Sequence, residues 1–378
     1  MIIRSIHINN LRNHCDSMLE FVEGVNILHG LNGVGKTTVI EAISLCGFSK
    51  SFLPTQDSFL VTNGAEGYSV SAFCESDLQI PYKVSVSFFG RKSIKSSHGD
   101  SLTPKDIIGE IPMVILSPDF KMITFGAPSD RRAFLDRLLS QCSRRYYEEL
   151  NNLRKILKQR NNLLSSKSGY FDKSLLDVWT EQLIQCSCEI ISRRNAFINE
   201  FTPYFRTAYA HISADGEKVS VHYEPNGVLS FSESHTQAEI YNALVKTARD
   251  LEEDEKRRGL TLFGPQKDEV MIMINNGVAR DYASQGQHKS LLIAIKSAEF
   301  EYLKAIRHET PVLLLDDVFS ELDIHRTERV FETIITHAKQ TFITTTEGGR
   351  LNSFIPDSTA TKYFTVVQGI VVEDSLLQ

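Results

Sequence analysis

The chain has 378 residues, of which 42% are hydrophobic and 23% charged, and its formal net charge is −6. This is the balance of an ordinary globular protein with room for two domains. A negative total gives no global sign of nucleic-acid affinity, so any DNA binding would require local basic surface. The start, Met1 to Arg4, lacks the apolar core of a signal peptide, and no apolar run is long enough to cross a bilayer. Six scattered cysteines without a C-x-x-C pair suit a reducing cytoplasm. We expect a cytoplasmic protein without a membrane partner.

The first part of the chain, to about residue 125, is predicted as strands and turns around one helix. The expected strands are Ile6–Ile8, Leu19–Phe21, Val25–Leu28, Tyr68–Cys74 and Val84–Phe89; the expected helix is Lys36–Cys46. The stretch Arg91–Asp100 is polar and is predicted as a loop.

A helical period begins near Ser129 and continues to Leu164, with apolar residues on one face, which predicts one long helix. A second helix is expected from Asp172 to Ala210, where Pro203 should kink or end it. A third is expected from Gln237 to Lys256.

The last hundred residues return to alternating strands and helices. The expected strands are Leu260–Phe263, Val270–Ile274, Val312–Leu315 and Gln340–Thr345, the expected helices are Ser284–Ile306 and His325–Lys339, and a hairpin should turn at Gln368–Gly369. The pattern predicts a discontinuous α/β ATPase domain, residues 1–125 and 258–378, interrupted by a helical arm lobe, residues 126–257.

A phosphate-binding loop follows the strand that ends at Leu28. Its eight residues fit G-x-x-x-x-G-K-[ST] at every fixed position and lie between a strand and a helix, where the pattern is most specific. Backbone amides and the helix N-terminus should hold the phosphates of ATP, Lys36 should bridge the β- and γ-phosphates, and Thr37 should ligate Mg²⁺. The expected ATP contacts here are Gly30, Leu31, Asn32, Gly33, Val34, Gly35, Lys36, Thr37 and Thr38.

A second acidic element completes this site. The apolar strand Val312–Leu315 ends in Asp316 and Asp317. We assign Asp316 to the Mg²⁺ ion and Asp317 to the attacking water. The expected catalytic residues are these two acids, Lys36 and Ser284, which belongs to the next element.

A third element, Ser284, Gly286 and Gln287, lies at the start of a predicted helix about thirty residues before Asp316. A serine and a glycine at a helix N-terminus can bind another phosphate. Because the first loop already serves one nucleotide, Ser284 would contact ATP held by a second copy, in a head-to-tail dimer. The motif alone could equally be a helix cap; its position before Asp316 favours the signature of ABC ATPases.

Two shorter segments follow the same logic. Ser320–Asp323 is predicted as a loop that crosses the dimer, and Thr344–Thr346 as the strand end where a switch residue contacts the γ-phosphate. A plain loop and a plain strand end remain the alternatives.

Seven segments together resemble the RecF family. They are Leu11–Asn13, Gly30–Thr38, Arg131–Asp136, Leu157–Asn161, Gly264–Pro265, Ser284–Gln287 and Asp316–Asp323. They occur in family order over nearly the whole chain, and the Arg131–Asp136 and Leu157–Asn161 segments are the most particular.

The resemblance implies a P-loop NTPase of the ABC type, with a Rad50/SMC-like head domain and an inserted α-helical lobe. It implies a weak, DNA-stimulated ATPase that dimerises with ATP and Mg²⁺ on double-stranded, single-stranded or gapped DNA in repair, recombination and replication. It further implies partners of the RecR and RecO kind that help load RecA, and nucleotide contacts from Arg12 and Asn13.

The chain departs from the family pattern in places. Gln266 stands where the family has histidine, so a role that needs a titrating ring is in doubt. Asp119 is the candidate for the corner that the glutamine loop occupies in ABC proteins. Asp317 is one methylene shorter than the glutamate of many ABC ATPases, which predicts slow turnover.

A DNA-binding surface is only weakly indicated. On one continuous helix, four basic residues would project within about 60° of one another: Arg137, Arg144, Lys155 and Lys158. This stripe could follow phosphates or be a solvated face. Arg131 and Arg132 project toward the apolar side and are expected to form contacts inside the protein.

Two other functions share these motifs: the nucleotide-binding subunit of an ABC transporter, and a scaffold that binds ATP without hydrolysis. Transporter cassettes pack the motifs closely, whereas some 247 residues (284 − 37) separate Thr37 from Ser284 here. The intact Asp316–Asp317 pair argues against the scaffold.

Overall fold

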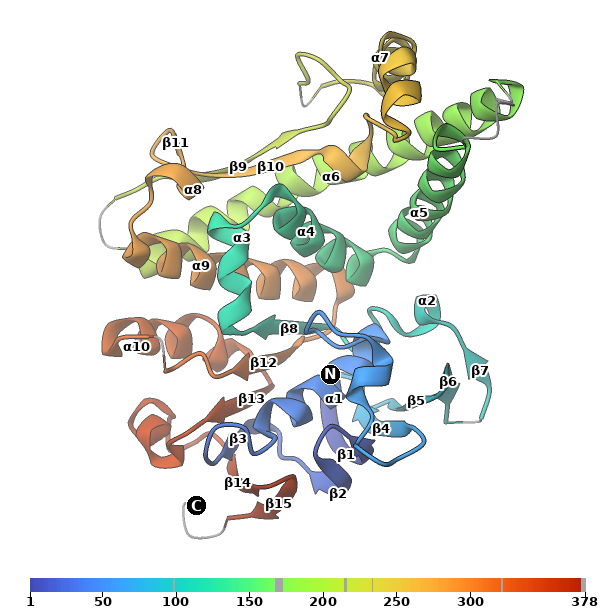
Figure 1. The fold of residues 1–378 in the computed structure, drawn as a ribbon. Coiled ribbons are helices and arrows are strands. Elements are labelled where there is room, and N and C mark those ends of the chain that lie inside the picture. The colour runs from blue at the N-terminus through green and yellow to red at the C-terminus, as the bar shows by residue number, and fades with distance from the viewer. Residues whose placement is uncertain (98, 167–172, 214–215, 233, 321, 375–378) are drawn as a thin grey trace. The chain divides into compact units, whose positions relative to one another are not determined.

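The computed structural model describes residues 1–378 except 98, 167–172, 214–215, 233, 321 and 375–378. The chain divides into two compact units (Figure 1). The first contains residues 1–120, 208–214 and 292–378, and the second contains residues 121–207 and 215–291. Residues 258–291, which the sequence pattern assigns to the ATPase domain, belong to the second unit because their strand β10 pairs with β9 there.

One sheet of the first unit is antiparallel, in the order β2-β1-β4-β5-β6-β7. Its strands are β1 (Ile2–Leu11), β2 (His14–Glu20), β4 (Tyr68–Glu75), β5 (Pro81–Phe89), β6 (Arg91–Ser96) and β7 (Ser101–Leu102). Buried side chains alternate with partly or fully exposed ones along β4, as expected of a sheet with one face on the core and one in water.

The other sheet has the order β15-β14-β3-β13-β12-β8 and is parallel except for β15. Its strands are β3 (Gly24–His29), β8 (Met113–Leu116), β12 (Val312–Asp316), β13 (Gln340–Thr345), β14 (Thr361–Val367) and β15 (Ile370–Glu373). All five residues of β12 are buried, which is why this strand is an unbroken apolar run up to its last residue. The carboxyl ends of parallel strands are where such sheets bind ligands.

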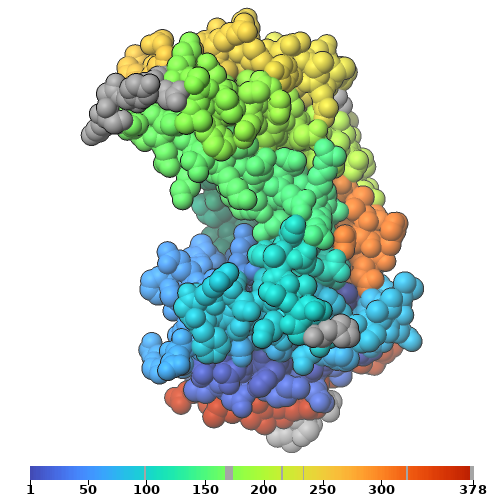
Figure 2. All heavy atoms as spheres, turned by 90° about the vertical axis from the view of Figure 1, so that its right-hand side faces the viewer, coloured from blue at the N-terminus to red at the C-terminus, as the bar shows by residue number. Residues whose placement is uncertain are grey.

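Helices pack on these sheets. Helix α1 (Lys36–Phe48) is buried along nearly its whole length. The others that begin or lie in this unit are η1 (Asp57–Leu60), α2 (Pro104–Ile107), η2 (Pro118–Lys121), α10 (Ile324–Thr333), η4 (Ile335–His337) and η5 (Gly348–Phe354). The blue N-terminal and red C-terminal segments lie side by side (Figure 2), because β14 pairs with β3.

The second unit is mainly helical. Its helices are α3 (Met122–Phe125), α4 (Pro128–Cys142), α5 (Arg144–Leu164), α7 (Gln237–Arg258), η3 (Pro265–Lys267), α8 (Ala279–Tyr282), most of α6 (Lys173–Ile212) and the start of α9 (Gln285–Arg307). A sheet of order β11-β10-β9 accompanies them, from β9 (Val219–Glu224), β10 (Glu269–Ile274) and β11 (Gly277–Val278).

The single helix predicted for 129–164 is wrong, because α4 ends at Cys142 and α5 begins at Arg144. Ser143 between them is extended, and its hydroxyl accepts from the Tyr146 amide at 3.2 Å. A serine that caps the next helix in this way competes with helix continuation. Pro203 does not end α6, which continues to Ile212.

Other local predictions also need correction. Arg91–Ser96 is strand β6 rather than a loop. Its backbone groups form hydrogen bonds with β5, and this pairing does not require apolar side chains. Residues 260–263 form no strand; side chains of Asn161 and Glu255 accept from the amides of Thr261 and Leu262 instead. Helix α10 ends at Thr333, six residues early. The hairpin at Gln368–Gly369 is confirmed, with φ of 48° and 80°.

None of the described helices combines the length and the apolar character needed to span a membrane.

Candidate nucleotide-binding site

The phosphate-binding loop connects β3 to α1. Gly30 and Gly35 have φ of 146° and 110°, which disfavours residues with a Cβ. At Gly35 a Cβ would also lie 2.6 Å from Asn13 Oδ1. Position 35 therefore needs glycine for two reasons: its positive φ and the close approach of Asn13.

Lys36 lies at the first turn of α1. Its Nζ donates to the carbonyl oxygens of Gly30 and Leu31, both at 2.8 Å. Burial lowers the pKa of the Lys36 ammonium, while the nearby carboxylates of Asp317 and Asp316 act in the opposite direction. Because both hydrogen-bond acceptors are neutral, the charge of Lys36 remains available to an anion at the loop.

Hydroxyl groups hold the two acids at the end of β12: Thr37 of the phosphate-binding loop and Thr344 of β13. Asp316 Oδ1 accepts from Thr37 Oγ1 at 2.8 Å and from Thr344 Oγ1 at 2.7 Å. Thr344 Oγ1 in turn accepts from the Asp317 amide at 2.9 Å. Asp317 has φ of 50°, a strained value for a non-glycine residue. Strands β12 and β13 and helix α1 thus place all four side chains together.

The environment of Asp316 disfavours its charge. Burial raises the pKa of the Asp316 carboxyl, against the lowering effect of the two threonine hydroxyls. Thr37 and Asp316 are the two oxygen donors that could hold a metal here. Among the described residues no group of three or more His, Cys, Asp or Glu could do so, so a cation would also need water and ligand oxygens.

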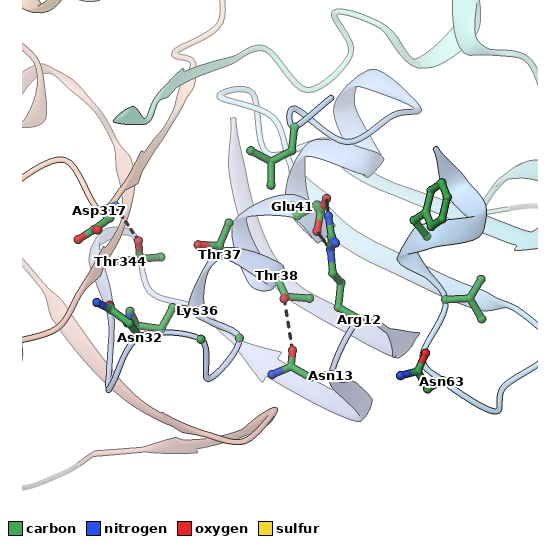
Figure 3. Close-up of a pocket in the computed structure, with 15 residues that line it drawn as sticks. Arg12, Asn13, Asn32, Lys36, Thr37, Thr38, Glu41, Asn63, Asp317 and Thr344 are labelled. Atoms are coloured by element: carbon green, nitrogen blue, oxygen red, sulfur yellow. Dashed lines mark hydrogen bonds and ion pairs between the residues drawn. The ribbon is translucent and has the colours of Figure 1, made fainter. Parts of the chain in front are cut away.

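A cavity of about 550 Å³ opens over this loop (Figure 3). That volume falls within the range of small-ligand pockets. It is lined by Arg12, Asn13, Asn32, Gly33, Gly35, Lys36, Thr37, Thr38, Glu41, Leu53, Phe59, Val61, Asn63, Asp317 and Thr344. The polar phosphate-binding residues and the apolar side chains of Leu53, Phe59 and Val61 suit a ligand with a charged end and a flat apolar end.

Arg12 and Asn13 lie beside the loop, at the turn between β1 and β2. Arg12 donates two hydrogen bonds to the buried Glu41 carboxylate, at 2.7 and 2.9 Å. Asn13 Nδ2 donates to Val34 O at 2.7 Å, and Thr38 Oγ1 donates to Asn13 Oδ1 at 3.4 Å. Glu41 also accepts from Ser51 Oγ at 2.5 Å. Pairing with Glu41 raises the pKa of Arg12, so this cation stays charged at the cavity wall.

The structure thus brings Lys36, Thr37, Asp316, Asp317 and the Arg12–Asn13 turn into one place. Sequence reasoning missed Glu41, although it lies four residues after Thr37, one helical turn along α1. It also missed Phe59 and Asn63, because a 3₁₀ turn and loop carry no motif. Asp119 is not among the residues that line the cavity.

Ser284 and Gln287 lie in the second unit, at the start of α9. They form a reciprocal cap. The backbone amide of Gln287 donates to Ser284 Oγ at 3.2 Å, and the backbone amide of Ser284 donates to Gln287 Oε1 at 2.7 Å. These two bonds show that Ser284 acts as the N-cap of α9. The predicted contact with a second nucleotide stays a proposal.

In the segment after Asp317, Asp323 caps α10 by accepting from the Arg326 amide at 2.9 Å. Ser320 Oγ donates to Asp317 O at 2.9 Å. Glu321 lies outside the described residues.

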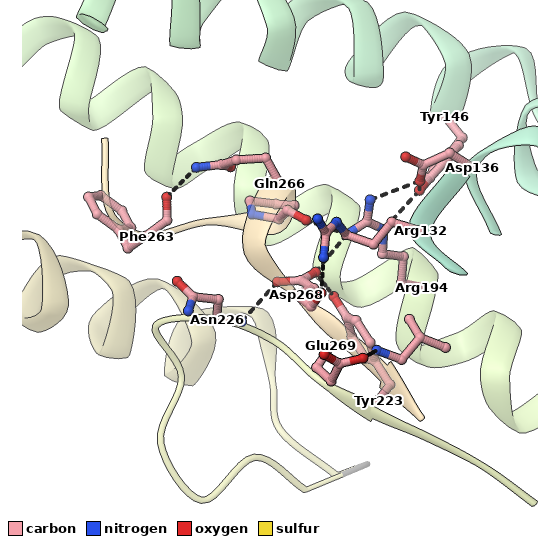
Figure 4. A network of polar contacts seen from close by, with 12 residues as sticks. Arg132, Asp136, Tyr146, Arg194, Tyr223, Asn226, Phe263, Gln266, Asp268 and Glu269 are labelled. Carbon is pink, nitrogen blue, oxygen red and sulfur yellow. Dashed lines mark hydrogen bonds and ion pairs between the residues drawn. The ribbon is translucent and has the colours of Figure 1, made fainter. Parts of the chain in front are cut away.

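The second unit contains a buried polar network (Figure 4). Arg194 NH1 donates to Asp268 Oδ2 at 2.7 Å, and Arg194 NH2 donates to Asp136 Oδ1 at 2.8 Å. Tyr223 OH also donates to Asp268, whose side chain is fully buried. The Gly264–Asp268 segment is thereby anchored to α6, while Gln266 Nε2 donates to Phe263 O at 2.6 Å.

The prediction that Arg131 and Arg132 form internal contacts is confirmed. Arg131 pairs with Glu269 at 2.6 Å, and Arg132 NH1 donates to Asp268 O at 2.6 Å. The basic stripe is not continuous, because Ser143 puts Arg137 on a different helix from the other three residues. Within α5, Arg144 lies 3.7 Å from Glu148.

Comparison with known proteins agrees with the fold. A family described as "AAA domain" matches residues 5–185. The head of an Smc protein, solved with the winged-helix domain of ScpA, matches with a TM-score of 0.58 over 100% of this chain and 98% of that one, at 15% identity. This last likeness concerns the fold alone.

Fold and site together define a P-loop ATPase with an ABC-type, SMC-like head. The chain is 38% identical to the DNA replication and repair protein RecF of Chloroherpeton thalassium, over 92% of this chain and 95% of that protein. The solved structure of a recombination mediator protein, RecF-ATP of the RecFOR pathway, matches with a TM-score of 0.89 at 29% identity, over 99% of this chain and 98% of that one. The chain belongs to the RecF family.

Proposed function

We propose that the protein is an ATP-gated DNA-binding protein of repair, recombination and replication. The observation that carries this proposal is a chain of hydroxyl contacts at 2.7 to 2.9 Å. Asp316 accepts from Thr37 of the phosphate-binding loop and from Thr344, whose hydroxyl accepts from the Asp317 amide. Because these residues are linked, a γ-phosphate bound at Lys36 would change the positions of Asp316, Asp317 and Thr344 together. The related RecF structure with ATP supports ATP as the ligand.

Mg²⁺ fits the donors that the site offers. Thr37 Oγ1 and Asp316 Oδ1 are 2.8 Å apart. Mg²⁺ prefers oxygen ligands, keeps several waters and binds phosphate oxygens, so this pair of oxygens beside the phosphate-binding loop fits it. When bound, Mg²⁺ would neutralise phosphate charge. Thr37 and Asp316 would hold it directly or through water.

Hydrolysis is assigned to Asp317, which would orient and polarise the attacking water. Asp317 directly follows β12 and lines the cavity over the phosphate-binding loop. Its short side chain favours slow turnover, and slow turnover suits a switch that resets after use. We expect DNA to stimulate this weak ATPase activity.

Dimerisation would couple ATP to DNA. In a head-to-tail pair, the α9 terminus at Ser284 would contact the γ-phosphate held by Lys36 of the partner copy. Two ATP molecules would then hold the dimer on double-stranded, single-stranded or gapped DNA. Partners of the RecR and RecO kind and the loading of RecA follow from the family, and the solved relative is named as part of the RecFOR pathway.

The direct test is DNA binding with ATP, with ADP and without nucleotide, for the wild type and for Lys36→Met. Fluorescence anisotropy with labelled gapped DNA should show binding with ATP only, and none for Lys36→Met. Equal binding in all three conditions would contradict an ATP gate.

A further inference from the structure

The outer face of the antiparallel sheet in the first unit has an unusual charge distribution. No Asp or Glu occurs between Leu78 and Gly99, although the whole chain has 47 acids against 41 bases. The same segment, which contains β5 and β6, contains four basic residues: Lys83, Arg91, Lys92 and Lys95. The molecule is acidic in total, so this segment is a local exception.

The register of the strands puts three of these cations on the outer face. Lys95 pairs with Ser85, Arg91 pairs with Phe89, and Lys83 lies two residues before Ser85 on the same side. Opposite them, Val84 and Ile94 are buried in the core. Lys92 lies on the inner side, where its Nζ is 2.7 Å from Asp57.

The three outer cations are exposed and have no acidic partner within the part of the chain that the structure describes. The nearest acid along the face of β4, Glu75, pairs with Arg4 at 2.8 Å. Residues of β5 to β7, light blue to cyan in Figure 2, form part of the surface in that view. These charges therefore act outward, into solvent.

Hydroxyl groups and two aromatic rings share this face. Ser71 and Ser85 are cross-strand neighbours, with their Oγ atoms 2.7 Å apart, and further serines flank them at 69, 87 and 93. Phe73, the partner of Lys83 in the register, is 42% exposed, and Phe89 is 59% exposed. Both rings are open to solvent, where a planar group could stack on them.

We propose that this face, defined by Lys83, Arg91, Lys95, Phe73 and Phe89, binds single-stranded DNA. Lys83 and Lys95 are diagonal neighbours about 7–8 Å apart on adjacent strands, and Arg91 lies about 13 Å from Lys95 along β6. Cations in such a row can follow a phosphate backbone, and serine hydroxyls can donate to phosphate oxygens. The rings can stack on unpaired bases, which a duplex does not offer. The inference rests on the proposed DNA-binding function, and it assigns that function a surface and a DNA form.

The test compares two triple variants of the full-length protein with ATP. Lys83→Ala/Arg91→Ala/Lys95→Ala removes the outer cations; Lys246→Ala/Arg249→Ala/Arg258→Ala removes three exposed cations of α7 and is the matched control. We expect the first to weaken binding of a labelled oligo-dT strand about tenfold or more and to lower its salt slope by about 2, and the control to change neither. Phe73→Ser should weaken the same strand about tenfold but leave a duplex of equal length unchanged.

A footprint tests the surface without any substitution. Oligo-dT should protect Lys83 and Lys95 of the wild type from acetylation, and leave the exposed Lys246 reactive. Loss of binding in the α7 variant instead, or equal loss of duplex binding for Phe73→Ser, would overturn the assignment. If the wild type binds no DNA with ATP, the proposed function itself fails; if it binds and the sheet variant binds equally, only this surface fails.

Discussion

Thr344 is the residue on which the acidic pair depends. Its hydroxyl donates to Asp316 and accepts from the Asp317 amide, so one side chain fixes both groups. Thr344→Val keeps the shape but removes these bonds, at a cost of about 1–3 kcal/mol. We expect ATPase activity to fall about tenfold or more, while Thr344→Ser retains most of it. Steady-state phosphate release measures both, and equal activities would show that the hydroxyl has no role.

Asp316 should make the stability of the ligand-free protein depend on pH. Because burial raises the pKa of its carboxyl, folding favours the protonated form. That contribution is present at acidic pH and is lost as pH rises through the folded-state pKa, so ionised Asp316 destabilises the protein at neutral pH.

Asp316→Asn should therefore raise the melting temperature at pH 8 without nucleotide, and the gain should shrink toward pH 5. Thermal denaturation at both values measures it. A gain that is equal at both values would mean that ionisation of Asp316 is not its cause.

At the scale of residues, the sequence predicts which residues contact ATP, but not which neighbouring side chains hold them in position. Gly30, Lys36 and Thr37 are fixed by a motif whose physics is local. The role of Thr344 depends on β13 lying between β3 and β12, and the pairing of Arg12 with Glu41 joins a strand turn to a helix. Contacts of this kind come from tertiary structure.

At the scale of elements, the buried Arg194 network should decide the stability of the second unit. Arg194→Met would leave Asp268 charged and buried without its partner, which costs about 3–5 kcal/mol. The control is Arg154→Met on the exposed side of α5. Trp179, the only tryptophan, lies in α6 of this unit. Urea unfolding followed by its fluorescence should show the loss for Arg194→Met alone; equal midpoints would refute it.

Helices and strands were predictable where the spacing of apolar residues was regular. Their boundaries were missed where a single residue ends an element. Helix α7 and the last hairpin follow from spacing and turn residues. The break at Ser143 escaped because the apolar period runs through it, while the capping bond to Tyr146 forms only in the folded chain. Strand β6 escaped because its residues are polar and only pairing with β5 makes it a strand.

For the whole molecule, a head-to-tail dimer predicts complementation. Lys36→Met damages the phosphate-binding loop, and Ser284→Arg damages the opposite contact. A pair made of one copy of each variant contains one intact composite site and one that is doubly damaged. Each variant alone should therefore be inactive. An equal mixture should recover up to about half of the wild-type ATPase activity, because only mixed pairs form and one of the two sites in each pair is intact.

Sedimentation velocity of this pair of variants tests the central claim most directly. With ATP and Mg²⁺ the wild type should sediment as a dimer, each variant alone as a monomer, and the mixture should regain a dimer fraction that ADP does not support. A wild type that stays monomeric with ATP, or a mixture that sediments like its separate components, would contradict an ATP-gated head-to-tail switch.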